Sequence, residues 1–149
     1  MNIENEIKTL NISDNKKAII NVIFTSNFLS EEISAVLKPF DLSLQQFNVL
    51  RILKGRKDKP ANLSFIQDRM ISRMSNTSRL VDKLIQKELV KRQICENNRR
   101  KVEIFITAKG KGMLEQVNKL VDEKEFEITE SLTAEQLQTL NRLLNDLRQ

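Results

Sequence analysis

The periodicity of apolar residues changes from helical to alternating after Glu88, and this change limits the possible folds more than any other feature. Before it, apolar residues recur at three- and four-residue steps, which is typical of amphipathic helices. After it, residues 90–94 and 102–106 alternate between apolar and polar, which predicts two strands. Residues 96–101 between them are polar and strongly basic. We therefore expect a mainly α-helical chain with a small β-hairpin.

Two short helices are expected directly before the hairpin. The first spans about residues 64–70 and buries Ile66 and Met70, and a brief turn follows at residues 71–74. The second spans about residues 75–87, and its buried stripe consists of Leu80, Val81, Leu84 and Ile85. Two short helices followed by a hairpin with a charged tip predict a winged helix-turn-helix.

Apolar helices are also expected near both ends of the chain. Asp14 can cap a long helix over residues 14–37, whose apolar face is wider than one neighbouring helix requires. The last helix opens at Thr133 and carries leucines at coiled-coil spacing. We expect one domain over residues 1–149, with dimerisation helices at 14–37 and 108–149 and a winged helix-turn-helix lobe at 38–107.

Several helix starts and one helix end can be located from capping residues. Ser43 and Thr133 are each followed three residues later by a glutamine, which predicts two capping boxes. Gly55 is expected to end the helix that Ser43 opens, and Thr107 can cap the helix after the hairpin.

The composition argues against an enzyme, a cofactor and a metal site. The 149 residues include no histidine and three glycines, so histidine-based nucleophile systems, imidazole metal sites and glycine-rich nucleotide loops are excluded. The acidic residues 123, 125, 127 and 130 do not converge on one point of a helix and are expected to form a solvated face. One cysteine and the lack of a signal segment or apolar span predict a cytoplasmic protein without a membrane partner.

Positive charge is concentrated in the middle of the chain. Residues 38–103 contain 16 Lys and Arg against 7 Asp and Glu, whereas the remainder contains 9 against 13. This asymmetry favours a polyanion as the partner of the middle segment, although an uneven solvated surface would give the same count.

Two stretches carry a resemblance to a known family. Residues 75–84 (SNTSRLVDKL), followed by residues 89–92 (LVKR), resemble the recognition helix and the start of the wing of the MarR family of bacterial regulators. Residues 99–101 (RRK) and 104–110 (IFITAKG) are similar to the wing arginine of that family and to the entry into its next helix. The resemblance covers about residues 16–147. It implies a homodimer whose first and last helices interleave.

Two positions depart from the family pattern. Asn98 stands where the family usually has the aspartate that braces the wing arginine, here Arg100. Glu88 stands where a glycine usually ends the recognition helix, so the helix lacks the residue that most easily adopts a left-handed conformation.

The resemblance implies a recognition helix in the major groove and a wing in the minor groove of DNA. The candidate DNA-binding residues are Ser64, Ser75, Asn76, Thr77, Arg79, Lys83, Arg99, Arg100 and Lys101. Three alternatives stay open. In the first, Ser75 serves only as a helix cap, and in the second, Arg79 forms a surface ion pair with Asp82 instead of contacting DNA. In the third, the basic hairpin is a solvent-exposed turn without a role in binding.

The expected function is that of a sequence-specific DNA-binding regulator, a repressor that binds double-stranded DNA at a pseudo-palindromic operator as a homodimer. The alternative is a winged-helix protein-interaction module that does not bind DNA.

The resemblance also implies a small, commonly aromatic ligand that binds in a crevice between the dimer helices and the DNA-binding lobe and weakens DNA affinity. The candidate ligand-binding residues are Phe24, Phe28, Phe40 and Phe47, for each of which core packing is the alternative. Cys95 is a single thiol without a resolving partner, and we expect it not to act as a redox switch.

Overall fold

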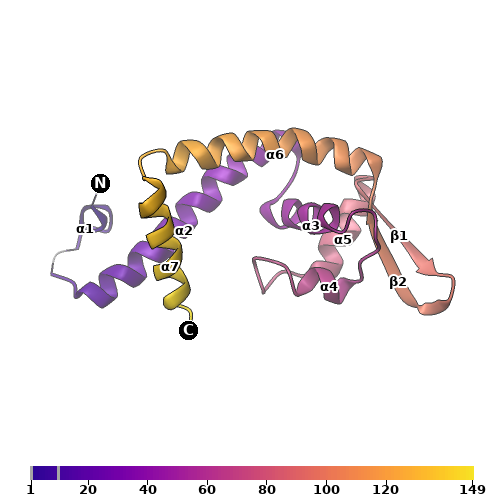
Figure 1. The fold of residues 1–149 in the computed structure, drawn as a ribbon, viewed down its shortest axis with the longest axis horizontal. Coiled ribbons are helices and arrows are strands. Elements are labelled where there is room, and N and C mark those ends of the chain that lie inside the picture. The colour runs from indigo at the N-terminus through magenta and orange to yellow at the C-terminus, as the bar shows by residue number, and fades with distance from the viewer. Residues whose placement is uncertain (1, 10) are drawn as a thin grey trace.

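The computed structural model describes residues 2–9 and 11–149, and their helices and strands follow the predicted order (Figure 1). The elements are α1 (Ile3–Glu6), α2 (Asp14–Leu37), the 3-10 helix η1 (Lys38–Phe40), α3 (Leu44–Gly55), α4 (Leu63–Gln67), α5 (Thr77–Gln86), β1 (Val90–Cys95), β2 (Asn98–Ile106), α6 (Ala108–Thr129) and α7 (Ala134–Asp146). The periodicity does not predict the four-residue helix α1. The fold class, mainly helical with a two-stranded hairpin, is confirmed.

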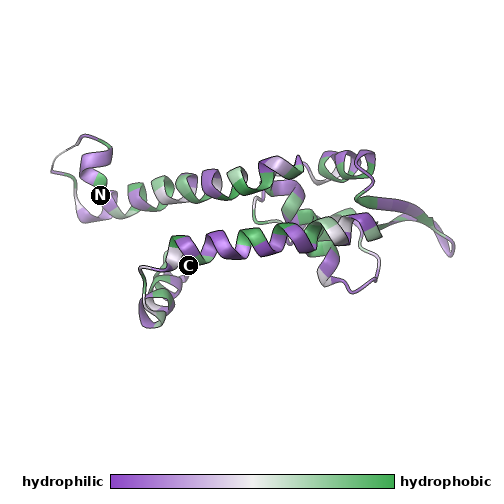
Figure 2. Ribbon diagram, turned by 90° about the horizontal axis from the view of Figure 1, so that it is seen from above, coloured by the Kyte–Doolittle hydropathy of each residue, from purple (hydrophilic) through white to green (hydrophobic). Residues whose placement is uncertain are grey.

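The elements form a lobe and an arm. Helices α3, α4 and α5 and the hairpin make up the lobe, and the long helices α2 and α6 extend from it and pack against each other (Figures 1 and 2). Helix α7 turns away from α6 at the end of the arm that is farthest from the hairpin. No helix formed by residues 2–9 or 11–149 is long and apolar enough to cross a membrane.

The hydrophobic core lies in the lobe and extends into the first half of α6. The fully buried side chains include Leu37, Leu50, Ile66, Val81, Leu84, Leu89, Ile104, Leu114 and Val117. Both residues predicted to be buried in α4 and its following turn, Ile66 and Met70, belong to this core. In α5 the predicted stripe is confirmed, with two members fully buried and two half-buried.

The predicted caps are confirmed at Ser43, Thr107 and Thr133, and the predicted cap of α2 is wrong. Ser43 and Thr133 both form the expected capping boxes with the glutamine three residues on. Helix α2, however, is capped by Ser13, whose hydroxyl oxygen accepts the Lys16 backbone N–H at 3.5 Å. Asp14 is instead the first helical residue, where its negative charge still complements the helix dipole.

The junction between the hairpin and α6 contains a left-handed residue. Glu88 has a φ of 61°, in the left-handed region that glycine adopts most easily. Its carbonyl oxygen accepts the Thr107 hydroxyl at 2.7 Å, and its carboxylate lies 3.1 Å from the Lys109 amine. Thr107 caps α6 as predicted by accepting the Gly110 backbone N–H at 3.0 Å. Glu88 therefore occupies a conformation that costs a side chain about 1–2 kcal/mol.

The hairpin is longer than predicted, and its turn is shorter. The strands pair in antiparallel register from Val90 opposite Ile106 to Ile94 opposite Val102, and then Cys95 lies opposite Asn98. The turn proper comprises only residues 96–97, because β2 begins at Asn98 rather than at Val102. Residues 99–101 therefore lie in β2 and not in the expected loop. They form a bulge, because no residues of β1 lie opposite them.

Candidate nucleic-acid interface

The amino end of α5 is fixed by Asn76. The side-chain oxygen of Asn76 accepts the Arg79 backbone N–H at 3.1 Å, so Asn76 is the N-cap and the helix begins at Thr77. The interpretation of Ser75 as the cap is therefore wrong. An asparagine caps a helix as well as a serine does, so the sequence alone could not distinguish the two neighbours.

Two of the three short polar side chains at this end are turned away from solvent. Thr77 is buried, and its hydroxyl donates a hydrogen bond to the side-chain oxygen of Gln67 in α4. Ser75 is half-buried, and its hydroxyl oxygen is buried without a hydrogen-bond partner among the residues that the structure describes. Asn76 is exposed. The structure thus joins Thr77 to the helix-turn-helix scaffold and leaves Asn76 at the surface.

The basic side chains of α5 face solvent. Arg79 and Lys83 are exposed, and Asp82 forms its ion pair with Arg92 of β1 at 3.1 Å rather than with Arg79. Across residues 2–9 and 11–149, no carboxylate oxygen lies within 4.0 Å of the Arg79 or Lys83 nitrogens. The alternative that Arg79 pairs with Asp82 is wrong. The Asp82–Arg92 pair instead links α5 to the hairpin.

The hairpin carries a second uncompensated basic surface. Arg99, Arg100 and Lys101 are exposed, and within the described part of the chain none of them has a carboxylate oxygen within 4.0 Å. The side-chain oxygen of Asn98 accepts the Arg100 backbone N–H at 3.1 Å, so it orders the backbone of the bulge and not the guanidinium. Cys95, opposite Asn98, is a half-buried free thiol.

Two arginines that the sequence analysis did not select pack against α4. Ser64 is exposed on this helix, as a phosphate contact requires. Next to it, the Phe65 ring lies under two guanidinium carbons, that of Arg69 at 3.5 Å and that of Arg56 at 4.5 Å. The spacing of four residues between Phe65 and Arg69 is a signal that could have predicted this contact. These arginines extend the positive surface of the lobe beside α4.

A cavity of about 980 Å³ lies between the arm and the lobe. It is lined by α2, α3, the turn after α4, α6, α7 and the residues that follow α7, with apolar and polar side chains in equal number. The charged groups among them are Arg51, Glu125 and Arg148. Phe47 is the one predicted aromatic residue among its lining residues. Phe24 and Phe28 lie exposed on α2, and Phe40 packs half-buried against the core.

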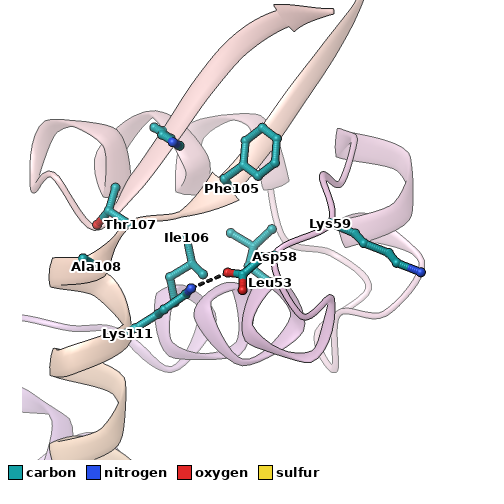
Figure 3. A pocket seen from close by; sticks show the side chains of 9 residues that line it. Leu53, Asp58, Lys59, Phe105, Ile106, Thr107, Ala108 and Lys111 are labelled. Atoms are coloured by element: carbon teal, nitrogen blue, oxygen red, sulfur yellow. Dashed lines mark hydrogen bonds and ion pairs between the residues drawn. The ribbon is translucent and has the colours of Figure 1, made fainter.

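A second, smaller cavity of about 400 Å³ lies at the base of the hairpin (Figure 3). Asp58 and Lys111 form an ion pair across it, and the hydrogen bond from Lys111 lowers the pKa of the Asp58 carboxyl below its usual value. Lys59 points away from the cavity. The charges of Asp58 and Lys111 in this cavity thus compensate each other. Within residues 2–9 and 11–149, no three acidic or cysteine side chains are grouped so as to hold a metal ion.

These elements define a winged helix-turn-helix protein: α4, a turn, α5, and a hairpin with a basic bulge. Residues 42–102 match the sequence model of the MarR family. The matched segment comprises the winged helix-turn-helix lobe, so the resemblance to the MarR family predicted from the sequence is confirmed for this part of the chain.

Three solved structures show how widely the fold is shared. A MarR-like transcription regulator from Bacillus cereus has 21% sequence identity and a TM-score of 0.80, over 91% of this chain and 96% of that one. MepR from S. aureus, solved in complex with DNA, has 18% identity and a TM-score of 0.77, over 91% and 96%. The organohalide-sensing regulator RdhR with 2,4-dichlorophenol bound has 17% identity and a TM-score of 0.84, over 93% and 81%.

Proposed function

We propose that this protein is a sequence-specific transcriptional repressor that binds double-stranded DNA in the cytoplasm as a homodimer. The observation that carries the proposal is the pair of uncompensated basic surfaces, one on α5 and one on the hairpin, which the Asp82–Arg92 ion pair links. Exposed cations without acidic partners are suited to a polyanion. MepR, which shares the fold, has been solved with DNA.

Helix α5 reads the major groove in this proposal. Arg79 can donate two parallel hydrogen bonds to the edge of a guanine, and Asn76 can reach a base or a nearby phosphate. Lys83, one turn further along α5, contacts a phosphate. Ser64 of α4 contributes a further phosphate contact. Thr77 is withdrawn from the proposed contacts, because its side chain is buried.

The hairpin acts as the wing. Arg99, Arg100 and Lys101 lie in the bulge of β2, and a bulge bends a strand and redirects its side chains. An arginine in a narrow minor groove is stabilised by the concentrated negative potential of A·T-rich DNA. We infer that the wing adds affinity and a preference for groove shape more than base-specific readout.

The arm supplies the dimer interface. None of the residues of α7 is buried in the single chain. The arm and the segment from α7 onward expose the large apolar side chains Ile19, Ile23, Phe24, Phe28, Leu120, Phe126, Leu140, Leu143 and Leu147. An apolar surface of this extent is unusual on a monomer and is covered by a second copy in the proposal, with residues 14–37 and 108–149 as the dimerisation segments and residues 38–107 as the lobe. Two lobes related by a two-fold axis then read a pseudo-palindromic operator.

The cavity between arm and lobe is the proposed ligand site. Its lining includes residues of α2, α6 and α7, the helices of the proposed dimerisation segments, and Met70 and Ile71 of the turn between α4 and α5. A bound molecule can therefore favour one spacing of the two lobes over another. RdhR, with the same fold, has been solved with a chlorophenol bound. A small aromatic compound that contacts Phe47 would release the operator by this route.

The proposal is tested by titrating fluorescently labelled random duplex DNA at low salt and by selecting preferred sites from a random duplex library. We expect measurable binding to the random duplex and a selected site with two inverted half-sites. The affinity for the selected site should fall steeply as the salt concentration rises. No binding to any duplex at low salt would contradict DNA binding and leave the protein-interaction module as the better explanation.

A further inference from the structure

Met74 is an apolar side chain held outward at the reading end of α5. It is 95% exposed and lies two residues before the N-cap, Asn76. A single exposed apolar residue on a protein surface normally needs no explanation. Met74 differs from such a residue because it lies at the amino end of α5, the helix that we propose to enter the major groove.

The turn that presents Met74 is fixed on both sides. Gln67 donates a side-chain hydrogen bond to the Arg73 carbonyl at 3.1 Å, and Arg73 donates to the Asp68 carbonyl at 2.8 Å. On the other side of Met74, the Ser75 backbone N–H donates to the Ser72 carbonyl at 3.2 Å. The exposure of Met74 thus follows from a braced backbone and is present before DNA arrives.

The polar side chains around Met74 are either hydrogen-bonded within the protein or buried. Thr77 is bonded to Gln67, the side-chain oxygen of Asn76 caps α5, and the Ser75 hydroxyl oxygen is buried. Fewer side chains at the amino end of α5 are therefore available for hydrogen bonds to base edges than the sequence suggests. An apolar group of the DNA is what an exposed methionine at this place can recognise.

We propose that Met74 determines sequence specificity by packing against the 5-methyl group of a thymine in the major groove. The inference rests on the proposed DNA-binding function and adds the base that this position reads. The thymine methyl is the apolar group that distinguishes one base-pair edge in the major groove. An unbranched thioether side chain adapts its shape to such a contact without needing a hydrogen-bond partner.

The test removes single methyl groups from the DNA. Each thymine of the selected operator is replaced in turn by uracil, which has the same hydrogen-bonding groups and lacks the methyl. For the wild-type protein we expect a loss of about fourfold in affinity at one thymine of each half-site and about fifteenfold when both are replaced, from the free energy of burying one methyl-sized group. The other thymines should have little effect.

The variants assign the effect to Met74. In Met74→Ala the dependence on that thymine methyl should disappear, and in Met74→Leu, which keeps an apolar side chain, it should largely remain. Ile94→Ala is the matched control, because Ile94 is also an exposed apolar residue, 63% exposed, but lies on β1. It should keep the full dependence.

The outcomes separate the inference from the proposed function. A wild-type protein that binds no duplex overturns both. A wild-type protein that binds its selected operator equally well with uracil at every position overturns only the assignment to Met74. The same holds if Met74→Ala retains the wild-type sensitivity to the methyl group.

Discussion

Gly110 is the position at which the structure predicts the clearest loss of stability. A Cβ atom added there would collide with the Leu89 carbonyl oxygen and would lie 2.8 Å from Cγ1 of Ile106. The Leu89 carbonyl is backbone and also accepts the Thr107 backbone N–H at 3.0 Å. Relief of the collision therefore requires moving either α6 or the segment that leads into the hairpin.

The magnitude follows from three opposing contributions. Overpacking of a tight contact costs about 1–3 kcal/mol. Displacing the Leu89 carbonyl weakens one hydrogen bond, which costs about 1 kcal/mol. Alanine in a helix interior is favoured over glycine by about 1 kcal/mol. We expect Gly110→Ala to lower the free energy of unfolding by about 1–3 kcal/mol.

Gly112 provides the matched control in the same helix. A Cβ atom at Gly112 meets no atom within 4 Å, so Gly112→Ala should raise the free energy of unfolding by up to about 1 kcal/mol. Urea unfolding of both variants at one protein concentration measures the difference, because a dimer's stability depends on concentration. Equal midpoints for Gly110→Ala and Gly112→Ala would refute the reasoning.

Three further predictions concern other parts of the fold. Glu88→Gly should raise the unfolding midpoint in urea by relieving a left-handed side chain (a gain of up to about 1 kcal/mol), and a lower midpoint would contradict this. Removal of residues 134–149 should yield monomer or aggregate in sedimentation, and a truncated protein that remains a dimer would disprove the proposed interface. Cys95→Ser should retain DNA binding and any response to oxidant, and loss of that response would make the thiol a switch.

Much of the fold could be predicted because periodicity and capping are local signals. The bounds of α2, the two capping boxes and the buried stripe of α5 all follow from the spacing of apolar and capping residues. The hairpin turn could not be placed, because the register depends on a bulge. Residues 99–101 read as a polar loop in the sequence and are a strand with no residues opposite.

The candidate site was predicted at the level of elements and only partly at the level of side chains. Thr77 and Asn76 are neighbours of the same polar character, yet one is buried against Gln67 and the other caps the helix from the surface. Only the three-dimensional packing of α4 on α5 distinguishes them. The partner of Asp82 could not be predicted from the sequence either, because Arg92 is ten residues away and becomes a neighbour only when β1 folds beside α5.

The most direct test of the account is the salt dependence of affinity for the selected operator and for random duplex DNA, measured for wild type, Arg79→Ala and Arg100→Ala. Arg79→Ala should reduce operator affinity by about 1–3 kcal/mol per half-site contact and random-duplex affinity by less. Arg100→Ala should weaken both and flatten the slope of log affinity against log salt by about one unit per lost phosphate-like contact. Equal losses on both duplexes for Arg79→Ala, or an unchanged affinity and slope for Arg100→Ala, would contradict the division of labour between α5 and the wing.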